Sequence, residues 1–133
     1  MIRSIISKRV SAIAVIVILS CTIIFHLLVL TGVVPYTIVW GSRLTSTEEM
    51  IRFEVFSLLI NGIMVTVVLI AAGYIRANIN TSLLRFMLWA MAVLFFLNTI
   101  GNILSTNRLE TIIFTPLTFL LALLCTRLAI EVD

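Results

Sequence analysis

Four long stretches without a charged side chain constrain the fold of this chain more than any other feature. An α-helix rises about 1.5 Å per residue, so about 20 apolar residues are needed to cross a hydrocarbon core of about 30 Å. The first three stretches reach this length, and the fourth does so if Arg127 snorkels toward the membrane surface. The stretches cover residues 10–42, 55–75, 86–107 and 111–126.

These stretches predict four transmembrane helices in one membrane domain. The first is longer than the roughly 7–15 apolar residues of a secretory signal core, so we expect it to be retained as a helix. The predicted fold is all-α, an antiparallel four-helix transmembrane bundle. An outer loop over residues 32–52 is expected between the first two helices. The predicted spans are residues 10–31, 53–75, 83–104 and 111–130.

The composition also favours burial in lipid. Hydrophobic residues make up 62% of the 133 residues and charged residues 11%, whereas soluble domains average about 45–50% apolar and about 25% charged residues. So few polar side chains cannot cover a surface that faces water. The basic residues are scattered at the ends of the apolar stretches and do not cluster, so we expect no nucleic-acid partner.

The distribution of basic residues predicts the orientation of the bundle. Cytoplasmic segments of membrane proteins carry an excess of Lys and Arg. With four spans, one side of the membrane receives six basic residues and the other receives three, so both termini are predicted to be cytoplasmic (N-in/C-in). The larger group is Arg3, Lys8, Arg9, Arg76, Arg85 and Arg127, and the smaller group is Arg43, Arg52 and Arg108.

The outer loop carries signals for two helix ends. Pro35 lacks a backbone N–H, and the residue before a proline avoids the α conformation, so the first helix should end before it. Ser46 followed by Glu49 matches a capping box. We therefore expect the second helix to begin near Thr47, a turn or two outside the membrane.

Polar side chains inside the predicted spans are the main functional clue, because each needs a hydrogen-bond partner in a medium without water. They recur every three or four residues and so form a stripe on each helix. In the predicted orientation, all four stripes lie in the outer half of the membrane. They are Thr22 and His26; Glu54, Ser57 and Asn61; Asn98 and Asn102; and Thr111, Thr115 and Thr118.

Two hypotheses explain this shared depth. The polar side chains either hold the helices together by hydrogen bonds, at about 0.6 kcal/mol each, or line a polar pocket that opens outward. Tyr36 and Trp40 are either anchors at the membrane interface or parts of a lid over such a pocket. Glu54 is alternatively expected to pair with Arg43 or Arg52 at the membrane surface. The candidate ligand-binding residues are His26, Tyr36, Trp40, Arg43, Glu54, Asn61, Asn98 and Asn102.

Several kinds of chemistry find no support in the residues. A single histidine leaves too few good ligands for a metal site, and we expect no cofactor. We see no Gly-rich phosphate loop, serine-nucleophile motif or paired carboxylates, so we expect no enzyme. Cys21 and Cys125 form no C-x-x-C motif and are interpreted as buried structural thiols. Proton-coupled exporters normally carry an acidic residue near the middle of a span, and this chain has none.

Two segments resemble a group of small bacterial four-helix integral membrane proteins of unknown function. The first is the run VVPYTIVWGSRL at residues 33–44, followed by Glu49-Met50 and Phe53-Glu54. The second is NTIGN at residues 98–102, which is similar to the third helix of that group. The resemblance implies a bacterial cytoplasmic membrane and implies no activity.

The leading hypothesis is a non-enzymatic membrane protein that binds a small amphipathic or lipid-like ligand in its outer half. One alternative is a small channel or carrier that works as a homodimer. Another is an accessory subunit of a larger membrane complex. The expected partners are therefore membrane lipids, together with an amphipathic ligand, a second copy of the chain or a membrane-complex partner.

Overall fold

The computed structural model describes residues 6–38, 45–106, 108 and 110–132, and this part of the chain is helical without any strand. Four long helices are joined by short connections, which confirms the prediction of an all-α four-helix bundle. Each is long and apolar enough to cross a membrane, if the turn before α5 is counted with that helix. The long helices are α2 (Lys8–Leu30), α3 (Thr47–Ala71), α4 (Thr81–Ile103) and α5 (Thr115–Glu131). The short elements are the 3₁₀-helix η1 (Tyr36–Ile38) and the π-helix η3 (Glu110–Phe114).

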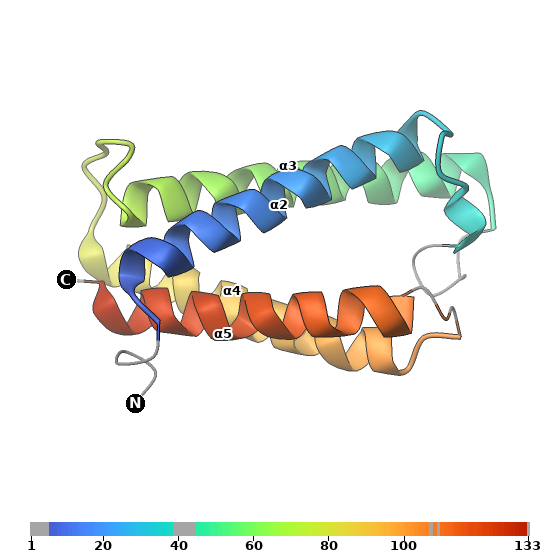
Figure 1. Ribbon diagram of the computed structural model, residues 1–133. Helices are drawn as coiled ribbons and strands as arrows, with labels where there is room; N and C mark the ends of the chain where they lie inside the picture. The colour runs from blue at the N-terminus through green and yellow to red at the C-terminus, as the bar shows by residue number, and fades with distance from the viewer. Residues whose placement is uncertain (1–5, 39–44, 107, 109, 133) are drawn as a thin grey trace.

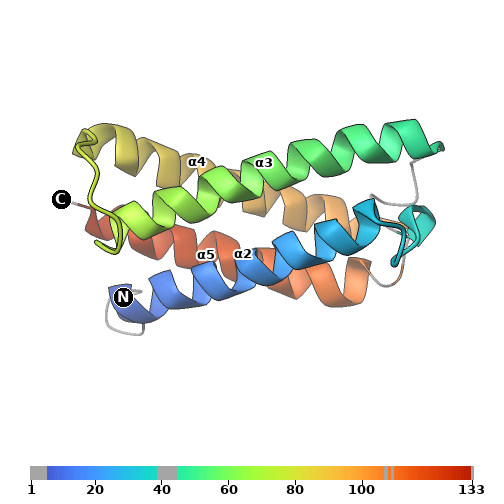
Figure 2. The same ribbon diagram turned by 90° about the horizontal axis from the view of Figure 1, so that it is seen from above.

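The helices are arranged as two pairs. The helices α2 and α3 pack along each other, as do α4 and α5, whereas α3 and α4 make the least contact of the neighbouring helices. The helix α2 also packs against α5. Successive helices run in opposite directions (Figures 1 and 2), and both chain ends lie at one end of the bundle. We call this the terminal end, and the other, which carries the α2–α3 and α4–α5 connections, the distal end.

A large apolar core fills the terminal half and the middle of the bundle. All four long helices contribute completely buried side chains to it, such as Leu19, Val68, Leu88 and Leu128. A second, smaller cluster lies at the distal end, where Val29 and Met50 are buried. Its half-buried members, including Tyr36, come from α2, the segment that follows it and η1. The apolar core shared by both pairs therefore lies toward the terminal end.

The helix ends follow from local capping chemistry. The Ser46 side chain accepts a hydrogen bond from the Glu49 N–H over 3.2 Å, so α3 begins at Thr47, as the capping box predicts. The helix α3 ends at Ala71, four residues before the predicted end. Gly73, at φ 86°, adopts the left-handed conformation that closes a helix, and a side chain there would be strained. The helix α3 therefore begins and ends earlier in the chain than the predicted span. It begins earlier because of the cap at Ser46 and ends earlier because of Gly73.

The start of the fourth span departs from a regular α-helix. Residues Glu110–Phe114 form a π-helical turn, and α5 begins only at Thr115. Pro116 lies in the first turn of α5, where its missing N–H costs no hydrogen bond. Further inside a helix, the same proline would remove a backbone hydrogen bond and clash with the preceding turn. The proline therefore explains why the α-helical part begins here.

Two predictions about single side chains in the membrane spans are wrong. Arg127 does not snorkel away from the bundle, because its side chain is only 4% exposed. Its Nε donates a hydrogen bond to the Ile6 carbonyl oxygen over 2.7 Å, and its guanidinium forms an ion pair with Glu131. Cys125 is buried as expected, but Cys21 is exposed on the outer face of α2. The hydrogen bond to Ile6 and the ion pair with Glu131 take the place of the contacts with water that a snorkelling side chain would make.

Candidate functional site

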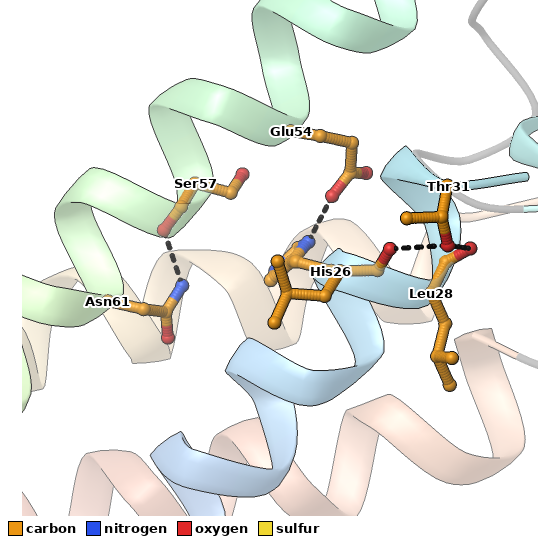
Figure 3. Close-up of polar contacts among 7 residues, drawn as sticks. His26, Leu28, Thr31, Glu54, Ser57 and Asn61 are labelled. Carbon is orange, nitrogen blue, oxygen red and sulfur yellow. Dashed lines mark hydrogen bonds and ion pairs between the residues drawn. The ribbon is translucent and has the colours of Figure 1, made fainter.

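The main polar contact between α2 and α3 is a hydrogen bond between His26 and Glu54. His26 Nδ1 lies 2.5 Å from Glu54 Oε2, and Figure 3 shows the two side chains pointing toward each other. Glu54 is completely buried, and the His26 side chain is 15% exposed. A carboxylate in this position favours the imidazole form with its hydrogen on Nδ1. The pair therefore joins the distal halves of the two helices.

The complete burial of Glu54 bears on the expectation that it pairs with Arg43 or Arg52 at the membrane surface. Arg52, one of the two arginines expected to pair with it, is exposed. Taking a carboxylate out of water is costly, and removing one partner of a buried pair typically costs about 3–5 kcal/mol. The hydrogen bond to His26 offsets part of this cost. The residues Arg43 and Trp40 of the predicted lid lie outside the described residues.

The polar stripe of α3 continues toward the middle of the membrane span. Ser57 and Asn61 are buried, one and two turns below Glu54. Asn61 Nδ2 donates a hydrogen bond to the Ser57 carbonyl oxygen over 2.8 Å, within the same helix (Figure 3). The inward orientation of this stripe therefore agrees with the prediction. The amide group of Asn61 uses one of its donors on its own backbone.

A second polar cluster joins α4 to the start of the fourth span. The hydroxyl oxygens of Thr99 and Thr118 lie 2.9 Å apart. Asn102 Nδ2 donates to Thr118 Oγ1 over 3.4 Å, and the Thr111 hydroxyl donates to the Asn102 carbonyl oxygen over 3.0 Å. These four residues hold α4 and α5 together at the distal end, which agrees with the hypothesis that polar side chains hold helices together.

The prediction that Asn98 faces the interior is wrong, because the structure places it on the exposed face of α4. Thr99 takes the inward position and is buried. Successive residues of an α-helix are rotated by about 100° around its axis. By this measure, Thr99 lies nearer than Asn98 to the centre of the buried face of α4, which includes Leu88 and Phe95. A comparison of the angular positions of Asn98 and Thr99 with that of the apolar face would have identified Thr99 as the inward residue.

Two aromatic side chains bring the two helix pairs together near His26. The rings of Phe25 and Phe114 meet edge to face with their centroids 5.3 Å apart. Phe25 also contacts the His26 ring, at 5.9 Å between centroids. Next to Phe114, the hydroxyl oxygen of Thr115 is buried and has no hydrogen-bond partner in the described structure. Buried polar atoms are nearly always paired, so this hydroxyl is an exception within the described structure.

Tyr36 lies at the distal end, where the chain leaves α2. It is the first residue of η1 and is half-buried against the cluster of Val29 and Met50. The interpretation of Tyr36 as an anchor at the membrane interface stays a prediction. The packing places an aromatic side chain over the distal end of the α2–α3 contact.

Two hollows lined by described residues lie away from both polar clusters. One is a groove of about 310 Å³ on the outer face of α4 and α5. The other, of about 330 Å³, lies at the terminal end between α2 and the end of α3. The first is lined by Trp89, Ala92, Val93, Phe96, Phe119, Ala122, Leu123 and Thr126, and the second by Lys8, Arg9, Ala72 and Tyr74.

The pair of His26 and Glu54 offers few ligand atoms for a metal ion. Among the residues that the structure describes, no three His, Cys, Asp or Glu side chains come together. His26 and Glu54 supply two ligand atoms at most from this part of the chain, and they already bind each other. The arrangement is suited to donating and accepting hydrogen bonds.

Comparison of the chain with protein-family models, curated proteins and solved structures finds no match. The resemblance to small bacterial membrane proteins therefore stays a prediction. Functional inference rests on the geometry of the two polar clusters and their surroundings.

Proposed function

We propose that the chain is a non-enzymatic integral membrane protein that binds a small amphipathic or lipid-like ligand at its distal end, between the two helix pairs. The observation that carries the proposal is the complete burial of Glu54, paired with His26, in the distal half of two membrane spans. Ionisable residues inside a span are costly and usually mark functional sites. A purely structural contact between two helices is made more cheaply by apolar side chains.

The packing of the distal half supports a ligand between the pairs. The large core shared by all four helices lies in the terminal half and the middle, whereas Val29 and Met50 form a separate cluster on the α2–α3 side. In Figure 1 the helix α2 diverges from α5 toward the distal end, where Phe25 and Phe114 still contact each other. In the proposed arrangement, the apolar part of the ligand packs against the rings of Phe25 and Phe114, which meet between the two pairs.

The polar groups on the two sides of this region suit an amphipathic molecule. On the α2 side, the partly exposed imidazole of His26 is reachable while Glu54 holds it in place. On the α5 side, Thr115 offers a buried hydroxyl without a partner in the described structure. Phe25 contacts both the His26 ring and Phe114, the residue that precedes Thr115 in the chain. A ligand with a polar head and an apolar body would satisfy the hydroxyl and cover the rings.

The structure changes the roles of several predicted ligand-binding residues. Asn98 is left out of the proposed site because it is exposed on the outer face of α4. Asn61 and Asn102 support the site indirectly, through hydrogen bonds to Ser57 and Thr118. Tyr36, Trp40 and Arg43 remain the proposed lid.

We further propose that the distal end faces outward from a bacterial cytoplasmic membrane, with both chain ends in the cytoplasm. The distribution of Lys and Arg supports this orientation. The alternative of a homodimeric channel or carrier is less well supported, because the buried core around Leu19, Val68, Leu88 and Leu128 fills the terminal half. No specific contact favours the alternative of an accessory subunit.

The proposal is tested by native mass spectrometry of the gently extracted protein, with identification of any small molecule that stays bound. Thr115→Val removes the unpartnered hydroxyl and keeps the shape of the side chain. Thr126→Val is the matched control, because the Thr126 hydroxyl is already bonded to the Ala122 carbonyl oxygen. We expect the wild type and Thr126→Val to retain one ligand species and Thr115→Val to lose most of it. Equal retention by all three proteins contradicts the proposal.

A further inference from the structure

The hollow at the terminal end combines two basic side chains with a membrane-boundary position. Its volume is about 330 Å³, and Lys8, Arg9, Ala72 and Tyr74 line it. Lys8 and Arg9 are the first two residues of α2, and Ala72 and Tyr74 follow the last residue of α3. The hollow therefore lies where two membrane spans end, which is the level of lipid headgroups. This end is opposite to the proposed ligand site and independent of it.

Local capping builds both walls of the hollow. On one side, the Ser7 side chain caps α2 by accepting from the Val10 N–H over 3.1 Å, which places Lys8 and Arg9 in the first turn. On the other side, the Tyr74 N–H donates to the Leu69 carbonyl oxygen over 2.9 Å, as in a Schellman motif. The left-handed conformation of Gly73 makes this bond possible.

The charge of the hollow is not compensated by the described part of the chain. The first turn of α2 contains no acidic residue, so the positive end of the helix dipole adds to the two side-chain charges. The ion pairs between described residues are His26–Glu54 and Arg127–Glu131, and neither involves Lys8 or Arg9. Glu131, in the last turn of α5, is paired with Arg127.

We propose that this hollow binds the phosphate group of an anionic phospholipid at the surface of the membrane. Lys and Arg side chains at a helix N-terminus are a favourable setting for phosphate, because charge, dipole and N–H donors act together. The phenol of Tyr74 is a further donor, and tyrosine favours the headgroup level. The small side chain of Ala72 keeps the hollow open. Basic pockets between membrane helices bind anionic headgroups by the same chemistry.

The test measures lipid retention by the full-length protein in native mass spectrometry. Phosphatidylglycerol and phosphatidylcholine are added separately to the detergent-solubilised protein. The test variant is Lys8→Gln/Arg9→Gln, and the control is Arg52→Gln/Arg76→Gln, which removes two exposed charges outside the hollow. We expect the wild type and the control to prefer phosphatidylglycerol. The test variant should lose about tenfold or more of that preference, since a charge-assisted contact contributes on that scale.

Two further measurements keep the proposal falsifiable. Ala72→Leu fills the hollow without changing charge and should also reduce phosphatidylglycerol retention. Inorganic phosphate is titrated as a soluble competitor, and we expect it to displace the lipid only weakly. Equal retention of both lipids by the wild type overturns the proposal, as does an equal loss in the test variant and the control. Tight binding of inorganic phosphate without retention of phosphatidylglycerol overturns the assignment to lipid.

Discussion

His26 Nδ1 and Glu54 Oε2 lie 2.5 Å apart across the contact between α2 and α3, with the carboxyl group completely buried. This relationship links stability to the proposed function, because the same hydrogen bond joins two helices and holds an imidazole beside Phe25. Its two roles are separable by mutation. A single substitution removes one member of a buried pair, whereas a double apolar substitution removes both members together.

The first prediction concerns the stability of this pair. Glu54→Ala should lower the free energy of unfolding by about 3–5 kcal/mol, because it removes the carboxyl group from a buried pair and opens a cavity. The double variant His26→Leu/Glu54→Leu should unfold within about 1 kcal/mol of the wild type or above it, because apolar replacements of a buried pair are often neutral. Unfolding by SDS titration in mixed micelles, followed by circular dichroism, measures both. A double variant as unstable as Glu54→Ala would contradict this account.

The second prediction concerns the buried arginine at the terminal end. Arg127→Leu should destabilise the protein by about 1–3 kcal/mol, because it removes the hydrogen bond to the Ile6 carbonyl oxygen and the ion pair with Glu131, whose side chain is 38% exposed. Arg76→Leu, at an exposed position of the same end, is the control and should change stability by no more than about 0.5 kcal/mol. Thermal unfolding in detergent compares the two. If both arginines are equally dispensable, the buried role assigned to Arg127 is wrong.

The third prediction compares two neighbours on α4. Thr99→Val should cost about 0.6 kcal/mol and at most about 1.7 kcal/mol, the range measured for hydrogen bonds between membrane helices. Asn98→Leu should be neutral or slightly stabilising, because this side chain is exposed on a face suited to lipid. The same SDS titration checks both variants. A larger loss in Asn98→Leu than in Thr99→Val would mean that α4 is rotated from the position described here.

Much of the fold could be predicted because length and hydropathy are properties of whole segments. The four spans follow from the charge-free stretches, and the start of α3 follows from Ser46 and Glu49. The end of α3 was harder to predict from the sequence, because Gly73 closes the helix inside an apolar stretch that continues beyond it. The π-helical turn before Thr115 also depends on backbone geometry that residue types do not encode directly.

The candidate site was harder to predict, because it depends on helix rotation. A stripe on one helix is visible in the sequence, and the stripe of Glu54, Ser57 and Asn61 is indeed buried. The choice between Asn98 and Thr99 turns on a rotation of one residue, which polarity alone cannot decide. Arg127 illustrates the same difficulty, since its partner Ile6 lies 121 positions away in the chain. Contacts between distant segments decide whether such a charge faces solvent or the interior.

The central claim is that the distal half of the bundle holds a ligand, and native mass spectrometry of His26→Leu/Glu54→Leu beside the wild type tests it most directly. Both proteins are extracted gently from the same membrane, and the double variant must first show wild-type circular dichroism and unfolding. The account predicts that the wild type carries one small amphipathic or lipid species and that the folded double variant has lost it. A folded double variant that carries the same species in the same amount would contradict the claim.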